Sequence, residues 1–176
     1  MFARSPDFVH KIVFLGDTQV GKTSLIQRYV YDTLSPDMTR TIGAVLHVKT
    51  IELDGEFHKQ VIWDLGGEES FAQLREQYCA AATAAFFIFD RTNLKSLEHI
   101  DDWLNALYSS AGKVVVIAVE NKIDLEAAIT DEQIKGILEV RGLQHIQTSA
   151  VENINVNNAF EELVKKIREK IKMRKN

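Results

Sequence analysis

The sequence predicts an α/β fold in which helices cover both faces of a mostly parallel sheet. Three observations lead to this prediction. Apolar runs alternate with stretches of helical periodicity along most of the 176 residues. The runs at 84–89 and 114–119 are apolar throughout, which is typical of strands buried on both faces. A Gly-containing segment, 16–23, joins the first apolar run to the first helical stretch, and such alternation favours a parallel sheet.

Length and composition indicate one globular domain. Hydrophobic residues make up 45% of the chain and charged residues 26%, which is enough to build a core. The net charge of −4 gives no reason to expect nucleic acid as a partner. Cys79 is the only cysteine, which excludes a disulfide framework and a cysteine-based metal site. The five histidines lie far apart without ligand spacing, and we expect exposed or ordinary core positions for them.

Nothing in the sequence predicts a membrane-inserted segment. No apolar stretch approaches the length of a membrane span, and the N-terminus lacks the apolar core of a signal peptide. Gly does not follow Met1 and no Cys ends the chain, so neither myristoylation nor prenylation is expected. The basic terminal helix favours a solvated end that complements the helix dipole, with weak contact to anionic lipid as the alternative. We therefore expect a cytoplasmic protein without a lipid anchor.

The first elements surround a phosphate-binding pattern. A strand is expected at 9–15 and a helix from 24, and between them Gly16-Asp17-Thr18-Gln19-Val20-Gly21-Lys22-Thr23 matches G-x-x-x-x-G-K-[ST]. Backbone N–H groups of such a loop cradle phosphates. Lys22 would reach the outer phosphates and the Thr23 hydroxyl would bind Mg²⁺. The alternative is a Gly-containing turn that matches by chance, which the strand and helix context disfavours.

A loop and a hairpin are expected next. Residues 32–41 are rich in Ser, Thr, Asp and Pro without periodicity, which indicates an exposed loop. Residues 45–53 alternate between apolar and polar, Asp54-Gly55 is a turn signal, and 57–63 returns as a second strand. The hairpin at 45–63 adds one antiparallel edge strand to the sheet.

The remaining elements are expected in regular order. A helix should follow the segment 64–69 and run to about residue 80. Strands are predicted at 84–89, 114–119 and 143–148, and helices at 94–108, from 130 onward, and at 156–172. Thr130 and Gln133 form a capping-box pattern at the start of one helix. Because ligands of such sheets bind at the carboxyl ends of strands, the polar motifs that follow the strands indicate the site.

Two of those motifs predict chemistry. Asp64 is placed to bind Mg²⁺ through a water, and Gly67 lets the backbone approach a terminal phosphate; the alternative is an ordinary Gly-Gly turn. In Asn121-Lys122-Ile123-Asp124, the Asp124 carboxylate can accept two hydrogen bonds from the N1–H and amine of guanine, which adenine cannot supply. The Lys122 stem can lie over the base. The alternative is a polar loop with a helix-capping Asp.

Taken together, these motifs resemble the Ras superfamily of small GTPases. The matching segments, in order, are 16–23, Thr41, 63–67, 121–124 and 148–150. The resemblance covers a domain at 9–173, leaving 1–8 as an N-terminal extension. Residues 39–43 are similar to the first switch of the Rab branch, whereas Trp63-Asp64-Leu65-Gly66-Gly67 is similar to the Arf branch. The resemblance implies a P-loop NTPase fold with a six-stranded sheet.

The function implied by the resemblance is a GTPase switch. It implies binding of GTP and GDP with Mg²⁺, and hydrolysis of GTP. Two loops, at about 34–43 and 64–80, would order around the γ-phosphate and relax after hydrolysis. These loops would be presented to effector proteins, and exchange factors and GTPase-activating proteins would be further partners.

The resemblance also implies roles for individual residues. Catalytic roles fall on Lys22, Thr41 and Glu68, and metal binding on Thr23, Thr41 and Asp64. The nucleotide-binding residues are Gly16, Asp17, Thr18, Gln19, Val20, Gly21, Lys22, Thr23, Ser24, Leu34, Thr41, Gly67, Asn121, Lys122, Asp124, Ser149 and Ala150. The Ala150 N–H would face O6 of guanine.

Several positions depart from the family pattern. Glu68 replaces the water-positioning Gln, and an ionised Glu accepts a hydrogen bond from water but cannot donate one to the γ-phosphate. It would act as a base or impair hydrolysis, depending on its protonation. Thr18 and Gln19 are bulkier than the usual residues and would crowd the γ-phosphate, unless Thr18 is a tolerated Rab-like variation. Leu34 stands where relatives place an aromatic against the guanine, which predicts a weaker grip on the base.

These departures leave more than one functional hypothesis open. The first is a switch that hydrolyses GTP slowly. The second is a module that stays GTP-bound because Glu68, Thr18 and Gln19 prevent hydrolysis. A third is an ATP-binding P-loop protein, which the residues at 121–124 disfavour.

Overall fold

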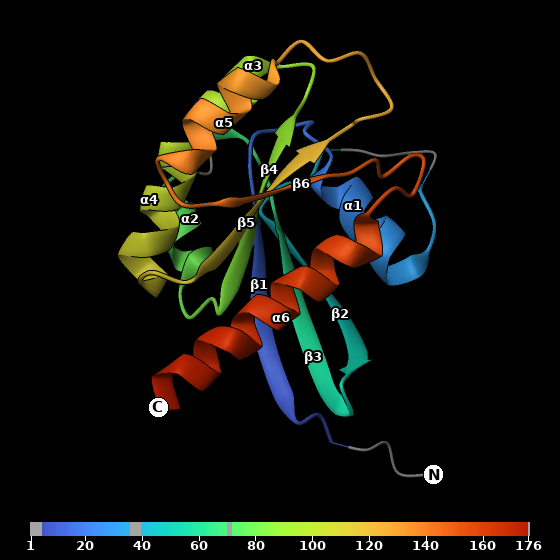
Figure 1. The fold of residues 1–176 in the computed structure, drawn as a ribbon, viewed down its shortest axis with the longest axis vertical. Coiled ribbons are helices and arrows are strands. Elements are labelled where there is room, and N and C mark those ends of the chain that lie inside the picture. Colours follow the sequence, from blue (N-terminus) through green and yellow to red (C-terminus); the bar gives the residue numbers. More distant parts are fainter. Residues whose placement is uncertain (1–4, 36–39, 70–71, 176) are drawn as a thin grey trace.

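The computed structural model describes residues 5–35, 40–69 and 72–175, which form a six-stranded sheet with helices on both faces (Figure 1). The strands are β1 (Phe8–Leu15), β2 (Ala44–Leu53), β3 (Glu56–Leu65), β4 (Ala84–Asp90), β5 (Val115–Asn121) and β6 (Gln144–Gln147). The helices are α1 (Lys22–Tyr31), α2 (Ala72–Cys79), α3 (Leu94–Glu98), α4 (Ile100–Ala111), α5 (Asp131–Glu139) and α6 (Val156–Lys175). Within these residues no helix is long and apolar enough to span a membrane.

The sheet confirms the predicted mixture of parallel and antiparallel pairing. Its strand order is β2-β3-β1-β4-β5-β6, and every neighbouring pair is parallel except β2 with β3. The β2–β3 turn is made by Asp54 and Gly55, with φ of 52° and 79°. Two residues with positive φ match the right-handed twist of a hairpin, which is why this dipeptide predicted the turn. Parallel pairing also brings the carboxyl ends of β1, β3, β4, β5 and β6 to one edge.

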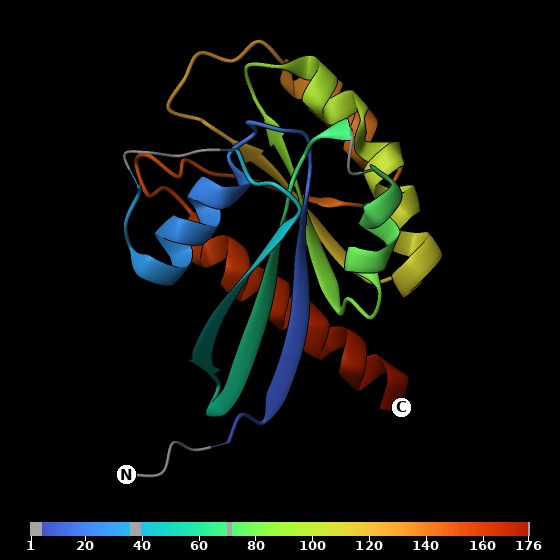
Figure 2. The same ribbon diagram turned by 180° about the vertical axis from the view of Figure 1, so that it is seen from behind.

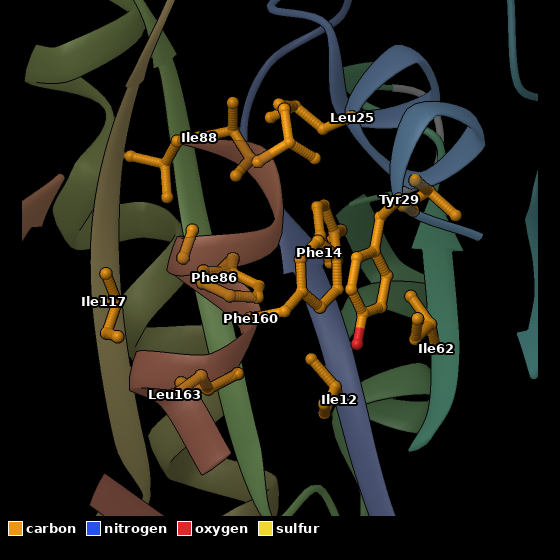
Figure 3. Close-up of a cluster of buried hydrophobic side chains, with 14 of the residues drawn as sticks. Ile12, Phe14, Leu25, Tyr29, Ile62, Phe86, Ile88, Ile117, Phe160 and Leu163 are labelled. Atoms are coloured by element: carbon orange, nitrogen blue, oxygen red, sulfur yellow. The ribbon is translucent and has the colours of Figure 1, made fainter. Parts of the chain in front are cut away.

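Each face of the sheet carries its own hydrophobic core. On one face, α1 and α6 pack over residues such as Phe14 and Phe86, and the ring of Tyr29 stacks on Phe160 at 3.5 Å between centroids (Figure 3). The other face, seen from behind in Figure 2, is covered by α2, α3, α4 and α5 around the fully buried Trp103. Because both faces are covered, every residue of β4 is buried, as its continuous apolar sequence predicted.

One predicted helix is in fact two. We expected one helix at 94–108, but the chain forms α3 and α4 with a break at His99. The side chain of Asn93 caps α3 by accepting a hydrogen bond from the Lys95 N–H. Apolar residues such as Leu97 and Ile100 continue the helical period across the break, and both are fully buried. The pattern therefore did not reveal the break.

Two histidines that are distant in sequence meet in the fold. His10 Nε2 lies 2.9 Å from His58 Nδ1, because β1 and β3 pair in parallel at the end of the sheet opposite the phosphate loop. Burial, together with the neighbouring His58, lowers the pKa of His10 to about 4. Both side chains are buried, which agrees with the expectation that the histidines take exposed or ordinary core positions. Other local predictions are confirmed, including the capping box of Thr130 and Gln133 on α5.

Candidate nucleotide-binding site

A cavity of about 310 Å³ lies at the carboxyl edge of the sheet, beside the loop that joins β1 to α1. It brings together segments that are far apart in sequence, from the first switch loop to the loop after β5. Its lining residues are Thr18, Gln19, Gly21, Lys22, Thr23, Ser24, Arg40, Thr41, Leu65, Gly67 and Lys122. Most of them belong to the motifs that the sequence analysis identified. Of the predicted base-binding residues only Lys122 lines this cavity, whereas Asn121, Asp124, Ser149 and Ala150 do not.

The loop at 16–23 has several residues with positive φ and packs closely against β4. Gln19 and Gly21 have φ of 65° and 98°, and a Cβ on Gly16 would lie 2.2 Å from the Ile88 carbonyl oxygen. The loop therefore needs glycine at position 16, where it packs against β4. The Lys22 ammonium donates to the carbonyl oxygens of Gly16 and Asp17 at 2.5 and 2.7 Å.

The ammonium of Lys22 is buried beside the cavity. Burial lowers its pKa to about 8, although the nearby carboxylates of Asp64 and Asp17 favour the charged form. A buried ammonium at the wall of an open cavity attracts an anion, so this side chain can bind a phosphate that enters the loop.

Three oxygen-bearing side chains converge next to Lys22 in a way that fits Mg²⁺. Thr23 Oγ1 lies 2.6 Å from Asp64 Oδ2 and 2.8 Å from Thr41 Oγ1, and Thr41 Oγ1 lies 3.3 Å from the same carboxylate oxygen. The second oxygen, Asp64 Oδ1, is buried without a hydrogen-bond partner among the described residues. Burial raises the pKa of Asp64, against the hydrogen bond from Thr23 and the charge of Lys22. Hydroxyl and carboxylate oxygens are the ligands Mg²⁺ prefers, and the unpartnered oxygen leaves room for one more bond.

The segment after β3 packs tightly on the phosphate loop. The Gly66 N–H donates to the Gly43 carbonyl at 2.8 Å, which joins the two switch loops. A Cβ on Gly67 would lie 2.2 Å from the backbone nitrogen of Thr18, so only glycine allows this approach. Glu68 follows directly, and its Oε1 lies 3.6 Å from Nη1 of Arg40. Residues 36–39 and 70–71 of the two switch loops lie outside the described residues.

The motif after β5 is held by side chains from other loops. Asn121 is almost fully buried; its amide donates to the Val20 carbonyl at 3.0 Å and accepts from Thr148 Oγ1 at 3.2 Å. Ser149 Oγ donates to Asp124 Oδ1 at 2.5 Å. Three parts of the chain are thus connected: the phosphate loop, the segment 121–124 and the segment 148–149.

Three further residues predicted to contact the base differ in their positions relative to the cavity. The Lys122 ammonium lies 2.5 Å from Asp90 Oδ2, which fixes the stem of the side chain at the cavity wall. Ala150 is buried, and its carbonyl accepts from Arg28 Nε at 3.0 Å. Leu34 is half-buried and does not line the cavity, so its contact with a base stays a prediction.

The side chain of Asp17 does not face the phosphate cavity. Its Oδ2 lies 2.6 Å from His99 Nδ1 and its Oδ1 accepts from Trp103 Nε1 at 3.0 Å. The guanidinium of Arg75, from α2, stacks on the ring of Trp103 at 3.7 Å. Only the backbone of Asp17 reaches Lys22. Sequence reasoning missed these partners because they are more than 80 residues away from Asp17 and share no motif with it.

Comparison with known proteins decides the family. The model of the Ras family matches residues 11–169. The chain belongs to this family. It is 36% identical over 164 residues to the Ras-related protein RABA4b of Arabidopsis thaliana, covering 92% of this chain and 73% of the relative. It is 34% identical over 157 residues to the Ras-related protein Rab11A of Lotus japonicus, covering 88% of this chain and 70% of the relative.

A third relative has similar identity and coverage. The Ras-related protein RABA5c of Arabidopsis thaliana is 33% identical over 167 residues, covering 93% of this chain and 78% of the relative. This Ras-family chain is therefore a Rab-like small GTPase, an enzyme that hydrolyses GTP, and its six-stranded fold is the one the resemblance implied. The likeness of residues 63–67 to the Arf branch stays a prediction.

Proposed function

We propose that this chain is a molecular switch that binds Mg²⁺ with GTP or GDP, hydrolyses GTP slowly, and presents its switch loops to effectors in the GTP state. One observation carries the proposal. The Thr41 hydroxyl lies 2.8 Å from that of Thr23 and 3.3 Å from the Asp64 carboxylate. A residue of the first switch loop thus completes the group of oxygens around the metal position, which couples that loop to the bound phosphates.

Each end of the site has a distinct task in this proposal. The loop at 16–23 and the start of α1, through Ser24, bind the phosphates, with Lys22 at the outer ones. Mg²⁺, held by Thr23, Thr41 and Asp64, neutralises charge that develops on the phosphates. The backbone N–H of Gly67 is the donor for the γ-phosphate.

Guanine binds at the other end of the site. Asp124 accepts hydrogen bonds from the base, while Asn121 ties its loop to the phosphate loop. The Lys122 stem covers the base, and the segment 149–150 supports it from the other side.

Slow hydrolysis follows from the charge near the γ-phosphate. The Glu68 carboxylate has no hydrogen to donate to the phosphate when ionised, and it adds negative charge beside it. The Arg40 guanidinium, at 3.6 Å, partly offsets that charge. The Thr18 side chain adds bulk to the cavity wall. We infer that these features lower the rate of hydrolysis without abolishing it.

Exposed apolar residues beside the first switch loop support effector binding. Ile42 is 75% exposed, and Leu46 and Val48 on the edge strand β2 are about half exposed. Apolar side chains that gather on a surface favour contact with a partner protein. Because they continue directly from Thr41, their arrangement would follow the state of the nucleotide.

A second candidate function is a module that remains GTP-bound. The same contacts favour it: Glu68 is already paired with Arg40, and Thr18 occupies the cavity wall. In this case the protein would bind partners constantly rather than in cycles.

Single-turnover hydrolysis separates the two functions. Protein loaded with GTP and Mg²⁺ is followed by phosphate release, for the wild type and for Glu68→Gln. A switch releases phosphate measurably, and Glu68→Gln raises the rate about 10-fold because an amide both accepts from water and donates to the phosphate. No release over many hours by the wild type would contradict the switch and support the GTP-bound module.

A further inference from the structure

A cluster of polar and charged side chains surrounds one buried carboxylate directly behind the segment 121–124. Glu120, the residue before Asn121, is fully buried, and its two carboxylate oxygens contact different elements. Oε1 lies 3.1 Å from Arg91 Nε, at the end of β4. Oε2 lies 3.0 Å from His145 Nε2 and accepts a hydrogen bond from Gln147 Nε2 at 3.0 Å, both on β6. One carboxylate therefore joins the ends of three neighbouring strands.

Arg91 extends this cluster into the guanine-side loop itself. Its Nη1 donates to the carbonyl of Ile123 at 3.0 Å, between Lys122 and Asp124. Its backbone N–H donates to the Asn121 carbonyl at 3.2 Å. Its own carbonyl accepts from the N–H groups of residues 128 and 129, where the chain leaves the loop. Arg91 thus contacts both sides of the loop and its middle.

Stability alone does not account for such a cluster. A buried ion pair gains little net free energy, because desolvation offsets most of the attraction between its charges. What it does supply is a fixed geometry, since a buried carboxylate that loses a partner is costly. The geometry fixed in this case is that of the backbone carrying Asn121 and Asp124.

We propose that Arg91, Glu120 and His145 form a positioning network for guanine recognition, which holds the segment 121–124 in place, slows nucleotide release and sharpens selectivity for guanine. The inference rests on the proposed function, in which Asp124 binds the base. None of the three residues needs to touch the nucleotide. Arg91 holds the backbone of Ile123 and Asn121, and Glu120 and His145 act by holding Arg91 in place.

The test compares guanine with hypoxanthine, because inosine diphosphate lacks the amine that would donate to Asp124. Dissociation rates and affinities of GDP and inosine diphosphate are measured with Mg²⁺ for the wild type and for Arg91→Ala. We expect GDP to dissociate about 10-fold faster from the variant, equivalent to one charge-assisted hydrogen bond. The preference for GDP over inosine diphosphate should fall by a similar factor. Glu120→Gln keeps the shape of the side chain but removes its charge. It should also raise the GDP dissociation rate and lower the preference for GDP over inosine diphosphate.

Arg141→Ala is the matched control. Arg141 makes a two-point ion pair with Asp101, with N–O distances of 2.8 and 2.6 Å, and its side-chain hydrogen bonds within the described residues go to Asp101 and Ile137 rather than to the segment 121–124. Because the pair is partly exposed, its loss should lower thermal stability only slightly and leave the GDP preference unchanged. Arg91→Lys, which keeps the charge but not the fork of donors, should recover part of the lost selectivity.

The outcomes are distinct. If Arg91→Ala and Glu120→Gln lower thermal stability as Arg141→Ala does, while GDP release and the GDP preference stay at wild-type values, the network is only structural and the inference is wrong. If Arg91→Ala does not fold, Glu120→Gln and Arg91→Lys decide by the same two measurements. If the wild type itself does not prefer GDP over ADP, the proposed function fails rather than the network.

Discussion

At the guanine end of the site, side chains from the ends of β4, β5 and β6 are buried and contact one another, whereas at the phosphate end two surface loops meet. Asn121, Thr148 and Ser149 are each at most 1% exposed. By contrast, the Arg40 and Glu68 side chains that connect the switch loops are 61% and 31% exposed. Exposed ion pairs contribute little, while buried and fully paired groups fix geometry. In the function proposed above, this difference lets one end hold the nucleotide while the other responds to its state.

Changing the base-recognition carboxylate should give the largest effect. Asp124→Asn removes the acceptor pair for guanine, and we expect GTP affinity to fall about 1,000-fold, because a site built for hydrogen bonds rejects a base that leaves them unpaired. Xanthosine triphosphate presents a carbonyl instead of the amine, so it should bind more tightly to Asp124→Asn than to the wild type. Competition binding measures both. If the affinity of Asp124→Asn for GTP does not fall relative to its affinities for ATP and xanthosine triphosphate, the guanine end does not determine nucleotide affinity.

A change at the glycine that packs on the phosphate loop should affect hydrolysis more than binding. In Gly67→Ala the new Cβ would lie 2.2 Å from the Thr18 nitrogen, so the segment must move. We expect the single-turnover rate to fall about 100-fold, as misplacement by about 1 Å does at other reacting centres, with GDP affinity nearly unchanged.

Gly136→Ala is the control for that glycine change. It lies in α5 with no atom within 4 Å of the added methyl, so it should leave hydrolysis unaltered. If Gly67→Ala lowered GDP affinity by the same factor as the hydrolysis rate, the two ends of the site would not be separate in function.

The smallest effect is expected at the exposed ion pair. Arg40→Ala should lower affinity for a non-hydrolysable GTP analogue about 2-fold and leave GDP affinity unchanged, because an exposed charge pair is weak and only the triphosphate extends toward it. Lys135→Ala is the matched control, since Lys135 forms an exposed pair with Glu139 at 3.7 Å on α5 and does not line the cavity. If Arg40→Ala lowered GDP affinity by a similar factor, Arg40 would not act on the γ-phosphate alone.

The sequence predicted best what depends on local pattern. The hairpin at Asp54 and Gly55, the buried strands and the phosphate loop all follow from neighbouring residues, and the structure agrees with them. The break at His99 was missed because apolar spacing continues across it.

Contacts between distant residues were not predictable in this way. The side chain of Asp17 contacts His99 and Trp103, and Glu120 contacts Arg91 and His145, through pairings that only the folded sheet creates. The family resemblance identified most of the residues that line the cavity, Arg40 and Leu65 excepted. It did not identify those that hold them from behind, which no motif marks.

The nucleotide that purifies with the protein tests the central claim most directly. Protein purified in Mg²⁺ is denatured, and the released nucleotide is identified and quantified by chromatography. A switch that hydrolyses GTP slowly and retains the product should release mainly GDP, at close to one molecule per chain. Release of GTP alone would contradict the cycle, and release of no guanine nucleotide would contradict the site itself.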